Sequence, residues 1–555
     1  MTNKTRQIIV VVAVFVIALA SLGTVIGLLV NTGQLSEYSD GFRYELKGSK
    51  ATIIGYEGSD TDVVVPDKVK GNRVVGIEKD AFKDLAESVK SIKFNCTYSS
   101  FSIANEAFRD LTALEKVVLP SNLKVIPGGA FRGCRSLKSV IMPSTVTEIS
   151  ENAFRECTSL NFIYNSENYS TDGEGAIKNN AVYLPASLLE IGSHAFDGCT
   201  SIVEAHFAKA LEKIGDYAFN GCTRFSDLEV ANDNEVTSIG EWAFYNTLLT
   251  SKENDQLSFP NLVTVGASAF KSVKTNFTYF ALPKTIKNIG ANAFAECTSA
   301  NKFVIAQDAQ LEAMGEGVFQ GCTNLTSVTL PTEIKEIPAK TFMGCFRLLY
   351  NDDFVIGKSV EKIGDGAFAI YTGRGTSYSV TTYSRRVIKV DPENENFVIT
   401  RLEDNKREGN TTSTYQQGLL TDTSGSTVYA YYGSYDSSSS NTMGKTFRFL
   451  DVKGDFLTNI STIRAYAFAG VDFEYIQLPT TIKEVGDYIF FGSKITACYT
   501  SAVPWELTKN SFSKVADGNP DVEVLLLKNT TGLEEFMRTL GEYGINARTY
   551  SGKLQ

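Results

Sequence analysis

The residue types best suited to chemistry in this 555-residue chain are its nine cysteines and two histidines. Zinc sites take closely spaced cysteine and histidine ligands, whereas the cysteines here are about 23 residues apart and histidine is nearly absent. Their constant position relative to a recurring phenylalanine predicts free thiols in a repeated core, because unpaired cysteine behaves as a small buried hydrophobe. Disulfides between neighbouring turns are the alternative, since adjacent strands lie within reach of a bridge. The seven cysteines that follow the phenylalanine by three residues are Cys134, Cys157, Cys199, Cys222, Cys297, Cys322 and Cys345.

Catalytic groups are scarce. A Ser-His-Asp arrangement needs a histidine, and only His194 and His206 are present. His194 stands in SHAF, a position that reads DYAF and ENAF in other copies, so a surface role is the simpler interpretation. Paired carboxylates can hydrolyse sugars, but the acidic residues here mostly occupy positions that vary between repeats. We therefore expect a protein that is not an enzyme, with no catalytic residue, cofactor, metal or small-molecule substrate.

A recurring phenylalanine predicts the fold. It usually follows a small residue, and most intervals are 22 to 26 residues, with one gap of 42 and one of 100. Such a period indicates a solenoid, because one turn cannot bury its apolar face alone and stacked turns bury a continuous core. The repeat positions are Phe82, Phe108, Phe131, Phe154, Phe196, Phe219, Phe244, Phe270, Phe294, Phe319, Phe342, Phe368, Phe468 and Phe490. As structural core we select Phe131, Phe154, Phe196, Phe219, Phe294, Phe319 and Phe342.

Each turn is built from parts with a physical reason. Residues 120–142 read PSNLKVIPGGAFRGCRSLKSVIM, and residues 143–164 read PSTVTEISENAFRECTSLNFIY. The apolar run before the proline has strand composition, and proline ends the strand because it cannot donate to a ladder. Glycine after the isoleucine, as at Gly192 and Gly240, suits a tight corner. The pattern predicts a β-rich solenoid, a right-handed coil with turns of about 23 residues and little helix.

The motif L-x-x-Φ-x-Φ-P-x-x-Φ-x-x-I-G-x-x-A-F-x-x-C-x-x-L resembles the BspA-like leucine-rich repeat family of surface proteins. Residues 41–82 resemble that family's entry segment, and residues 165–173 and 390–422 resemble its irregular turn. The resemblance covers roughly residues 41–500, in many agreeing copies. It implies adhesion to components of a host or of neighbouring cells.

The N-terminus predicts a membrane anchor. Residues 8–30 carry no charge and are long enough to span a hydrocarbon core of about 30 Å as a helix. Lys4 and Arg6 precede this segment and no basic residue follows it closely, so we expect a cytoplasmic N-terminus and extracellular repeats. A signal peptide cleaved near Ala20, giving a secreted protein, is the alternative.

Charge and length also limit the function. The chain has 53 Lys and Arg against 63 Asp and Glu, a formal net charge of −10, which does not suit nucleic acid. Residues 522–527 predict a strand, residues 531–543 a helix capped by Thr531, and residues 545–550 a last strand, together a small α/β cap. The predicted domains are a cytoplasmic tail (1–7), a signal anchor (8–30), a linker with entry strands (31–59), leucine-rich repeats (60–370), a Tyr/Ser-rich insertion with an irregular turn (371–460), further repeats (461–500) and the C-terminal cap (501–555).

A binding surface is the remaining expectation. In each strand the central residue points inward and its two neighbours point outward, so outward pairs should form a ribbon along the solenoid, and exposed aromatics on a rigid face make good contacts. The insertion is a second candidate, because insertions in solenoids often form loops on the binding face. A merely solvated ribbon and a flexible insertion are the alternatives. The candidate residues are Phe162, Tyr164, Glu204, His206, Asp227, Glu229, Tyr279 and Tyr475 on the ribbon, with Tyr429, Tyr431 and Tyr432 in the insertion.

Two functions remain open. The first is a membrane-anchored cell-surface protein that binds an extracellular protein or glycan. The second is a structural repeat scaffold of the envelope without a dedicated ligand.

Overall fold

The computed structural model describes residues 36–164, 181–249, 256–274, 279–348, 354–370, 388–402, 418–432, 446–449, 457–471, 474–493, 495–503, 506–514 and 521–551. The chain forms two compact units, Met1–Ile202 and Val203–Gln555. The predicted anchor at residues 8–30 and the irregular turn expected at residues 165–173 lie outside the described residues. Among the residues that are described, no helix has the length and apolar character needed to cross a membrane.

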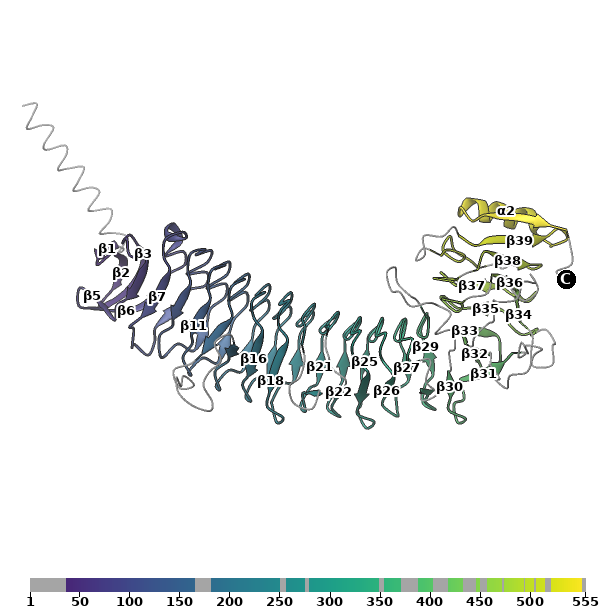
Figure 1. The fold of residues 1–555 in the computed structure, drawn as a ribbon, viewed down its shortest axis with the longest axis horizontal. Helices are drawn as coiled ribbons and strands as arrows, with labels where there is room; N and C mark the ends of the chain where they lie inside the picture. Colours follow the sequence, from purple (N-terminus) through teal and green to yellow (C-terminus); the bar gives the residue numbers. More distant parts are fainter. Residues whose placement is uncertain are drawn as a thin grey trace, which may run out of the picture. The chain divides into compact units, whose positions relative to one another are not determined.

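The first unit begins with a mixed sheet and continues as stacked parallel strands (Figure 1). The sheet contains β1 (Ser36–Ser39), β2 (Phe42–Lys47), β3 (Lys50–Tyr56), β6 (Asn72–Ile77), β5 (Lys68–Val69) and β8 (Ser102–Ile103). The longer parallel strands are β4 (Asp62–Val65), β7 (Ser91–Phe94), β9 (Lys116–Val118), β11 (Ser139–Ile141), β13 (Phe162–Tyr164) and β14 (Ala181–Tyr183). A second row consists of two-residue strands: β10 (Val125–Ile126), β12 (Glu148–Ile149) and β15 (Glu190–Ile191). A short 3-10 helix, η1, spans Lys83–Leu85.

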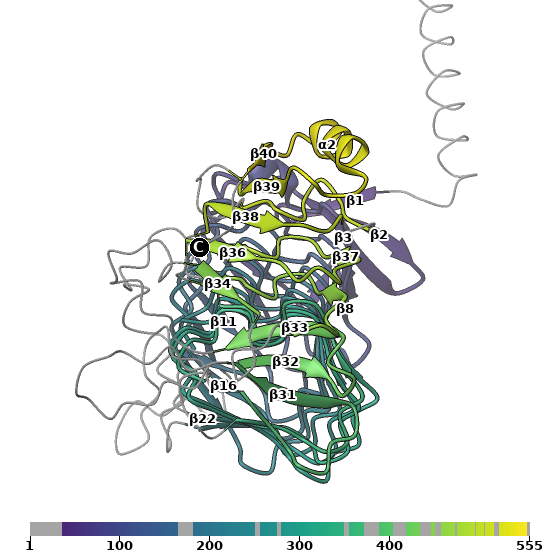
Figure 2. The ribbon, with the colours of Figure 1, turned by 90° about the vertical axis from the view of Figure 1, so that its right-hand side faces the viewer.

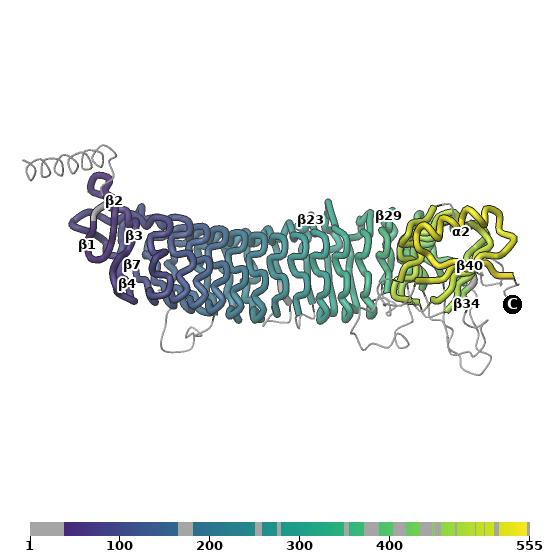
Figure 3. Tube along the Cα trace, turned by 90° about the horizontal axis from the view of Figure 1, so that it is seen from above, coloured from purple at the N-terminus to yellow at the C-terminus, as the bar shows by residue number. Residues whose placement is uncertain are grey.

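The second unit repeats this arrangement, and its turns run side by side in Figure 3. Its longer strands are β16 (Glu204–Phe207), β18 (Asp227–Val230), β20 (Gln256–Ser258), β22 (Tyr279–Leu282), β24 (Lys302–Ile305) and β26 (Ser327–Thr329). The two-residue strands β28 (Val355–Ile356) and β30 (Lys389–Val390) pair with each other. The short row contains β17 (Lys213–Ile214), β19 (Ser238–Ile239), β21 (Thr264–Val265), β23 (Asn288–Ile289), β25 (Ala313–Met314), β27 (Glu336–Ile337) and β29 (Lys362–Ile363). The strands pair in parallel within each row, and the β-rich solenoid of stacked coils is therefore confirmed.

The C-terminal part of the second unit contains two five-stranded sheets (Figure 2). In one, β31 (Phe397–Arg401), β32 (Gly418–Asp422) and β33 (Thr427–Tyr432) are antiparallel, and β33 continues in parallel to β35 (Thr462–Ile463) and β37 (Glu484–Val485). The other is parallel and contains β34 (Thr446–Arg448), β36 (Tyr475–Gln477), β38 (Ala497–Thr500), β39 (Glu523–Leu527) and β40 (Ala547–Tyr550).

The helix α2 (Leu533–Glu542) connects β39 to β40 and buries Phe536 and Leu540, much as the sequence predicts. The predicted cap at Thr531 is wrong. Gly532 is the N-cap, with a left-handed φ of 76° and no hydrogen bond from a capping side chain. Glycine adopts this conformation without the steric cost of a Cβ atom. The helix therefore begins after a left-handed glycine, and no side chain caps its first turn.

The repeat phenylalanines stack ring on ring in the interior of each unit. Phe131 and Phe154 have centroids 5.4 Å apart and planes 6° apart, and Phe219 and Phe244 have centroids 5.5 Å apart and planes 1° apart. Such offset stacks add to the apolar burial of each ring. All the phenylalanines and cysteines selected as structural core are buried: Phe131, Phe154, Phe196, Phe219, Phe294, Phe319, Phe342, Cys134, Cys157, Cys199, Cys222, Cys297, Cys322 and Cys345.

A tight corner follows each short strand and sets the position of the phenylalanine. A Cβ on Gly240 would lie 2.5 Å from the backbone of the preceding turn, at Gly215 and Asp216, so only glycine fits there. Two residues further on, Trp242 has a φ of 55°, and the equivalent Tyr217 also has a φ of 55°. We call this position the slot: it precedes the Ala-Phe pair and holds a left-handed residue in turn after turn.

Candidate binding surface

In β9, β11, β13 and β22 the side chains beside the central residue are at least partly exposed, as the ribbon predicts. The expectation is wrong for Glu204 of β16, which is buried against its neighbours. In β13, Ile163 is fully buried while Phe162 and Tyr164 on either side are partly exposed. Their rings lie against each other with centroids 4.6 Å apart. An aromatic pair that is packed but still partly exposed offers contact area at low entropic cost.

A second aromatic position of the ribbon lies on β22. Tyr279 is partly exposed and is in register with Lys302 of β24. The Lys302 ammonium lies 5.4 Å from the centre of the Tyr279 ring, which is a cation–π contact between adjacent turns. The ring is therefore held in place before any partner arrives.

The third position lies on the C-terminal parallel sheet. Tyr475 of β36 and Tyr499 of β38 have ring centroids 6.0 Å apart, and Tyr499 and Tyr550 of β40 have centroids 5.4 Å apart. The predicted Tyr475 therefore belongs to a cluster of three tyrosines. All three side chains are partly exposed. Burial raises the pKa of Tyr499 and of Tyr550, which keeps both phenols neutral at physiological pH.

Two candidates from the insertion are not on the surface. Tyr431 is 2% exposed and Tyr432 is 4% exposed, so the expectation of an exposed tyrosine loop is wrong for both. The reason is that β33 packs as a solenoid strand and places Tyr431 on Phe468, with ring centroids 5.9 Å apart. Tyr429 is half-buried, edge-on to Phe397, and burial raises its pKa.

The acidic part of the ribbon is drawn together around a histidine. His206 Nε2 lies 3.0 Å from Glu204 Oε1 on the same strand, and His206 Nδ1 lies 3.0 Å from Glu229 Oε2 on β18. Asp227 is in register with Glu204 across the two strands. Within the described part of the chain, the three residues Glu204, His206 and Glu229 form the one group whose ligand-type atoms lie within 4.8 Å of one another.

Sequence reasoning missed a second aromatic row, which lies in the slots. The rings of Tyr217 and Trp242 have planes 9° apart and centroids 6.2 Å apart, and Tyr245 meets Trp242 edge-on at 4.7 Å. All three side chains are partly exposed, and the Lys271 ammonium lies 5.8 Å from the Trp242 ring. The signal was present in the sequence, since two successive copies read DYAF and EWAF.

The same slot arrangement recurs near the C-terminus. Tyr466 and Tyr488 stack with centroids 5.6 Å apart, and Phe491 meets Tyr466 edge-on at 5.4 Å. Lys340 lies over Tyr466, with its ammonium 5.9 Å from the ring centre. Two neighbouring slot aromatics and a third ring three residues later therefore form a motif of this chain, which we call the slot platform.

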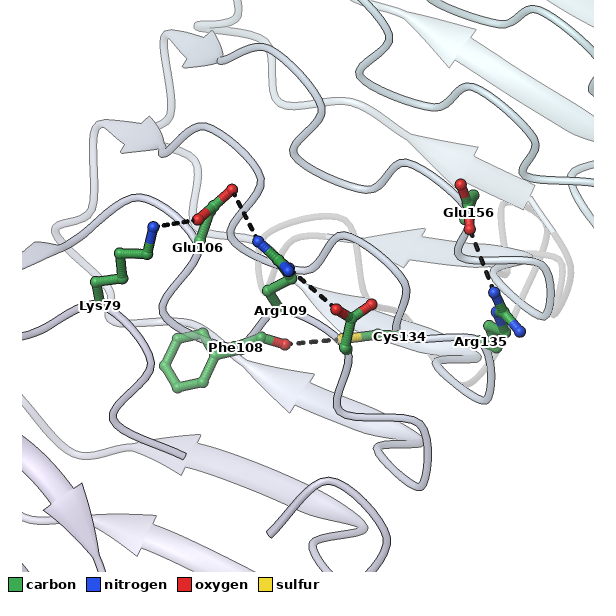
Figure 4. Close-up of polar contacts among 8 residues, drawn as sticks. Lys79, Glu106, Phe108, Arg109, Cys134, Arg135 and Glu156 are labelled. Carbon is green, nitrogen blue, oxygen red and sulfur yellow. Dashed lines mark hydrogen bonds and ion pairs between the residues drawn. The ribbon is translucent and has the colours of Figure 1, made fainter. Parts of the chain in front are cut away.

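The repeat cysteines form a row of inert interior groups. Cys134 Sγ donates to the carbonyl of Phe108, 3.1 Å away in the preceding turn (Figure 4). Cys157, Cys297 and Cys322 make equivalent bonds. All nine cysteines are free and buried, which confirms the prediction made for the seven repeat cysteines. Burial raises the pKa of the Cys96 thiol to about 12 and raises that of Cys134 further, so few thiolates exist at neutral pH.

Charged side chains join neighbouring turns on the outside. Glu106 accepts Lys79 at 2.5 Å and Arg109 at 3.4 Å, and Arg135 pairs with Glu156 at 3.5 Å (Figure 4). The hydrogen bond from Lys79 lowers the pKa of Glu106. Such exposed pairs contribute little to stability, and we assign them no role in binding.

His194 also lies in an ionic cluster. Its Nδ1 is 2.8 Å from Asp197 Oδ2, and Arg155 Nε reaches the same carboxylate at 3.3 Å. His194 lies in the slot position of its turn, with a φ of 55°. These contacts place the ring beside a carboxylate and a guanidinium on the outer face of the first unit.

Comparison with protein families gives one match. The model of the BspA type leucine rich repeat region, which describes six copies of the repeat, matches residues 75–183, 175–254, 249–372 and 452–518. These segments cover more than half of the chain. No protein with a curated description matches the chain.

Several solved structures have a similar chain path. A leucine-rich repeat protein from Bacteroides ovatus has 17% identity and a TM-score of 0.46, with 93% of this chain and 100% of that chain covered. A leucine rich cell surface protein from Faecalibacterium prausnitzii has 21% identity and a TM-score of 0.37, with 60% and 86% covered. The pneumococcal vaccine antigen PcpA has 12% identity and a TM-score of 0.34, with 94% and 99% covered. Likenesses at these values carry no functional inference.

Proposed function

We propose that this chain, which belongs to the BspA type leucine-rich repeat family, is displayed on the cell surface and binds an extracellular protein or glycan through aromatic side chains held on rigid turns. In this proposal the solenoid is a frame, and no catalysis takes place. The partner contacts the ribbon of the longer strands and the slot platforms. We propose that this binding makes the cell that displays the protein adhere to a host or to neighbouring cells.

One observation carries this proposal: aromatic rings are packed against their neighbours yet partly exposed, again and again, at outward positions. The pair of Phe162 and Tyr164 and the platform of Tyr217, Trp242 and Tyr245 are examples. A ring already fixed by neighbouring turns loses little freedom on binding, and large amphipathic rings are enriched among the residues that dominate interfaces. Covering such rings therefore contributes to the binding free energy with little loss of side-chain entropy.

The slot backbone fixes the direction of the platform side chains. A left-handed backbone costs an ordinary residue about 1–2 kcal/mol compared with glycine, and each turn with a non-glycine slot residue bears this cost, so the strain belongs to the repeat as a whole. Tyr217, Trp242, Tyr466 and Tyr488 all have positive φ values, from 52° to 63°. These rings are partly exposed, so burial offsets the strain only in part.

Membrane anchoring through residues 8–30, with the repeats outside, belongs to the same proposal. It rests on the uncharged length of this segment and on the basic residues that precede it. Protease added to intact cells should remove the repeats. Complete protection of the repeats in intact cells, with digestion after lysis, would contradict the proposed display.

The binding itself is tested with the purified full chain, in detergent, against extracellular matrix proteins and an array of glycans. We expect at least one saturable partner, and we expect its affinity to fall at least tenfold in a variant carrying Phe162→Ala and Tyr164→Ala, or Tyr217→Ala and Trp242→Ala. The non-aromatic pair Lys116→Ala and Ser139→Ala, of which Lys116 is exposed and Ser139 partly exposed, is the matched control on the same row of strands. A chain that binds nothing in either screen, or that binds equally well in both aromatic variants, would favour the scaffold without a ligand.

A further inference from the structure

The cluster around His206 is unlike the rest of the ribbon in both charge and burial. It lies on β16 and β18, where Glu204 is in register with Asp227 and His206 is in register with Glu229. Only one of these four side chains can carry a positive charge. Like charges directly opposite each other on neighbouring strands destabilise a sheet, so this arrangement favours a cation.

Two members of the cluster are also removed from most of the solvent. The Glu204 side chain is only 10% exposed and that of His206 22% exposed, while that of Glu229 is 63% exposed. A carboxylate removed from water needs a compensating positive charge or hydrogen bonds to its charged form. The buried carboxylate of Glu204 lies beside Nε2 of the His206 ring, and the exposed carboxylate of Glu229 lies beside Nδ1.

The distances suit a metal ion. Glu204 Oε1 and His206 Nε2 are 3.0 Å apart, and a tetrahedral ion with bonds of about 2.0–2.2 Å holds neighbouring ligand atoms roughly 3.4 Å apart. A shift of a few tenths of an ångström would therefore admit an ion between them. The other ring nitrogen, Nδ1, lies 3.0 Å from Glu229 Oε2, and a metal-binding histidine usually donates its second N–H to a carboxylate in this way.

We propose that Glu204 and His206 bind a divalent transition-metal ion of the zinc type at the edge where β16 and β18 meet. Glu204 Oε1 and His206 Nε2 are the ligands, and Glu229 is a positioning residue that accepts the Nδ1–H. Asp227 adds negative charge from the neighbouring strand. A nitrogen ligand beside a carboxylate favours zinc and its neighbours over calcium or magnesium, which prefer oxygen. Two protein ligands leave further coordination positions for water.

The test is calorimetric titration of Zn²⁺ alone into the full chain, purified in chelator and then freed of it. We expect one saturable site in the parent and loss of that site in His206→Asn and in Glu204→Gln. Glu229→Gln should keep the site with about 10- to 100-fold weaker affinity, the usual effect of removing the carboxylate that orients a ligand histidine. All nine cysteines remain in each variant, so thiols cannot account for a loss.

His194→Asn is the matched control, because His194 is the other histidine of the chain and also lies beside a carboxylate, Asp197. It should bind zinc as the parent does. The melting temperature with and without Zn²⁺ gives a second readout, since an ion that binds the folded chain raises it; the rise should occur in the parent and in His194→Asn but not in His206→Asn. No zinc binding by the parent, or binding that survives both His206→Asn and Glu204→Gln, would overturn the proposal.

Discussion

Two stretches of the second unit bury an aromatic stack, and only one of them shows it as a sequence repeat. Between residues 203 and 348 each turn carries its own Phe, and Phe219 N donates to the Ala243 carbonyl of the next turn at 2.8 Å. In the insertion no such repeat is visible, yet Tyr431 N donates to the Ala467 carbonyl at 2.8 Å and its ring lies on Phe468. Tyr431 therefore takes the place of a repeat phenylalanine.

The difference teaches that the position in the stack, not the motif, decides burial. The antiparallel strands β31 to β33 bring a tyrosine to the end of the stack by a different chain path. A reader of the sequence sees a cluster of tyrosines and expects an exposed surface. In the structure, the position next to Phe468 in the stack is filled by an aromatic ring, and that ring belongs to Tyr431.

The largest effect is expected in the regular stretch. Phe219→Ala should lower the free energy of unfolding by about 3–5 kcal/mol, because it removes a fully buried ring and leaves a cavity between two turns. Urea denaturation monitored by circular dichroism measures the loss. A variant that unfolds like the parent would show that this stack does not hold the turns together.

Tyr431→Ala should cost a similar amount, about 3–5 kcal/mol, if the two stretches are equivalent. Tyr431→Phe is the control, and it should keep most of the stability because the ring remains. If Tyr431→Ala is as mild as a surface change, Tyr431 is not a member of the stack and the comparison fails.

Six thiols whose pKa is raised by burial should respond to pH together: Cys96, Cys134, Cys157, Cys322, Cys345 and Cys498. Their folded pKa values lie above those of the unfolded chain, to about 12 for Cys96, so this contribution to stability is complete below the unfolded thiol pKa of about 8.5 and is lost as the pH rises towards the folded value. At pH 8 alkylation of the native chain should be slow, while the denatured chain should expose nine thiols. Fast labelling of the native chain, or fewer than four thiols after denaturation, would contradict free buried cysteines.

The smallest effect is expected at the cap helix. Thr531→Ala should change the stability by less than about 0.5 kcal/mol, because Gly532 is the N-cap and no side chain caps α2, whereas loss of a true threonine cap costs about 1 kcal/mol. Thermal unfolding of the two proteins compares them directly. A loss near the larger value would restore the cap that the sequence suggested.

The fold could be predicted because each turn repeats the same physical solution. The spacing of the phenylalanines, the proline after the strand and the corner glycine each indicate the turn independently, and the interior position of Cys134 and its equivalents follows from them. The ribbon was also predictable, since alternation along a strand is fixed by its geometry.

The rest needed three dimensions. Nothing in the sequence pairs Tyr431 with Phe468, because the path through the insertion is not periodic. The contact of His206 with Glu229 depends on the parallel register of β16 and β18, and the sequence gives only a list of outward residues. The slot aromatics were visible in DYAF and EWAF, but their left-handed backbone and mutual stacking were not.

The central claim is that rigid outward aromatics, not the charged surface in general, form the contact with a partner. The most direct measurement is the affinity of an identified partner for the full chain with Phe162, Tyr164, Tyr217 and Trp242 all changed to serine, beside the parent, with melting temperatures recorded for both. We predict a loss of binding of at least a hundredfold, with a melting temperature close to that of the parent. Unchanged affinity in this folded variant would contradict the account.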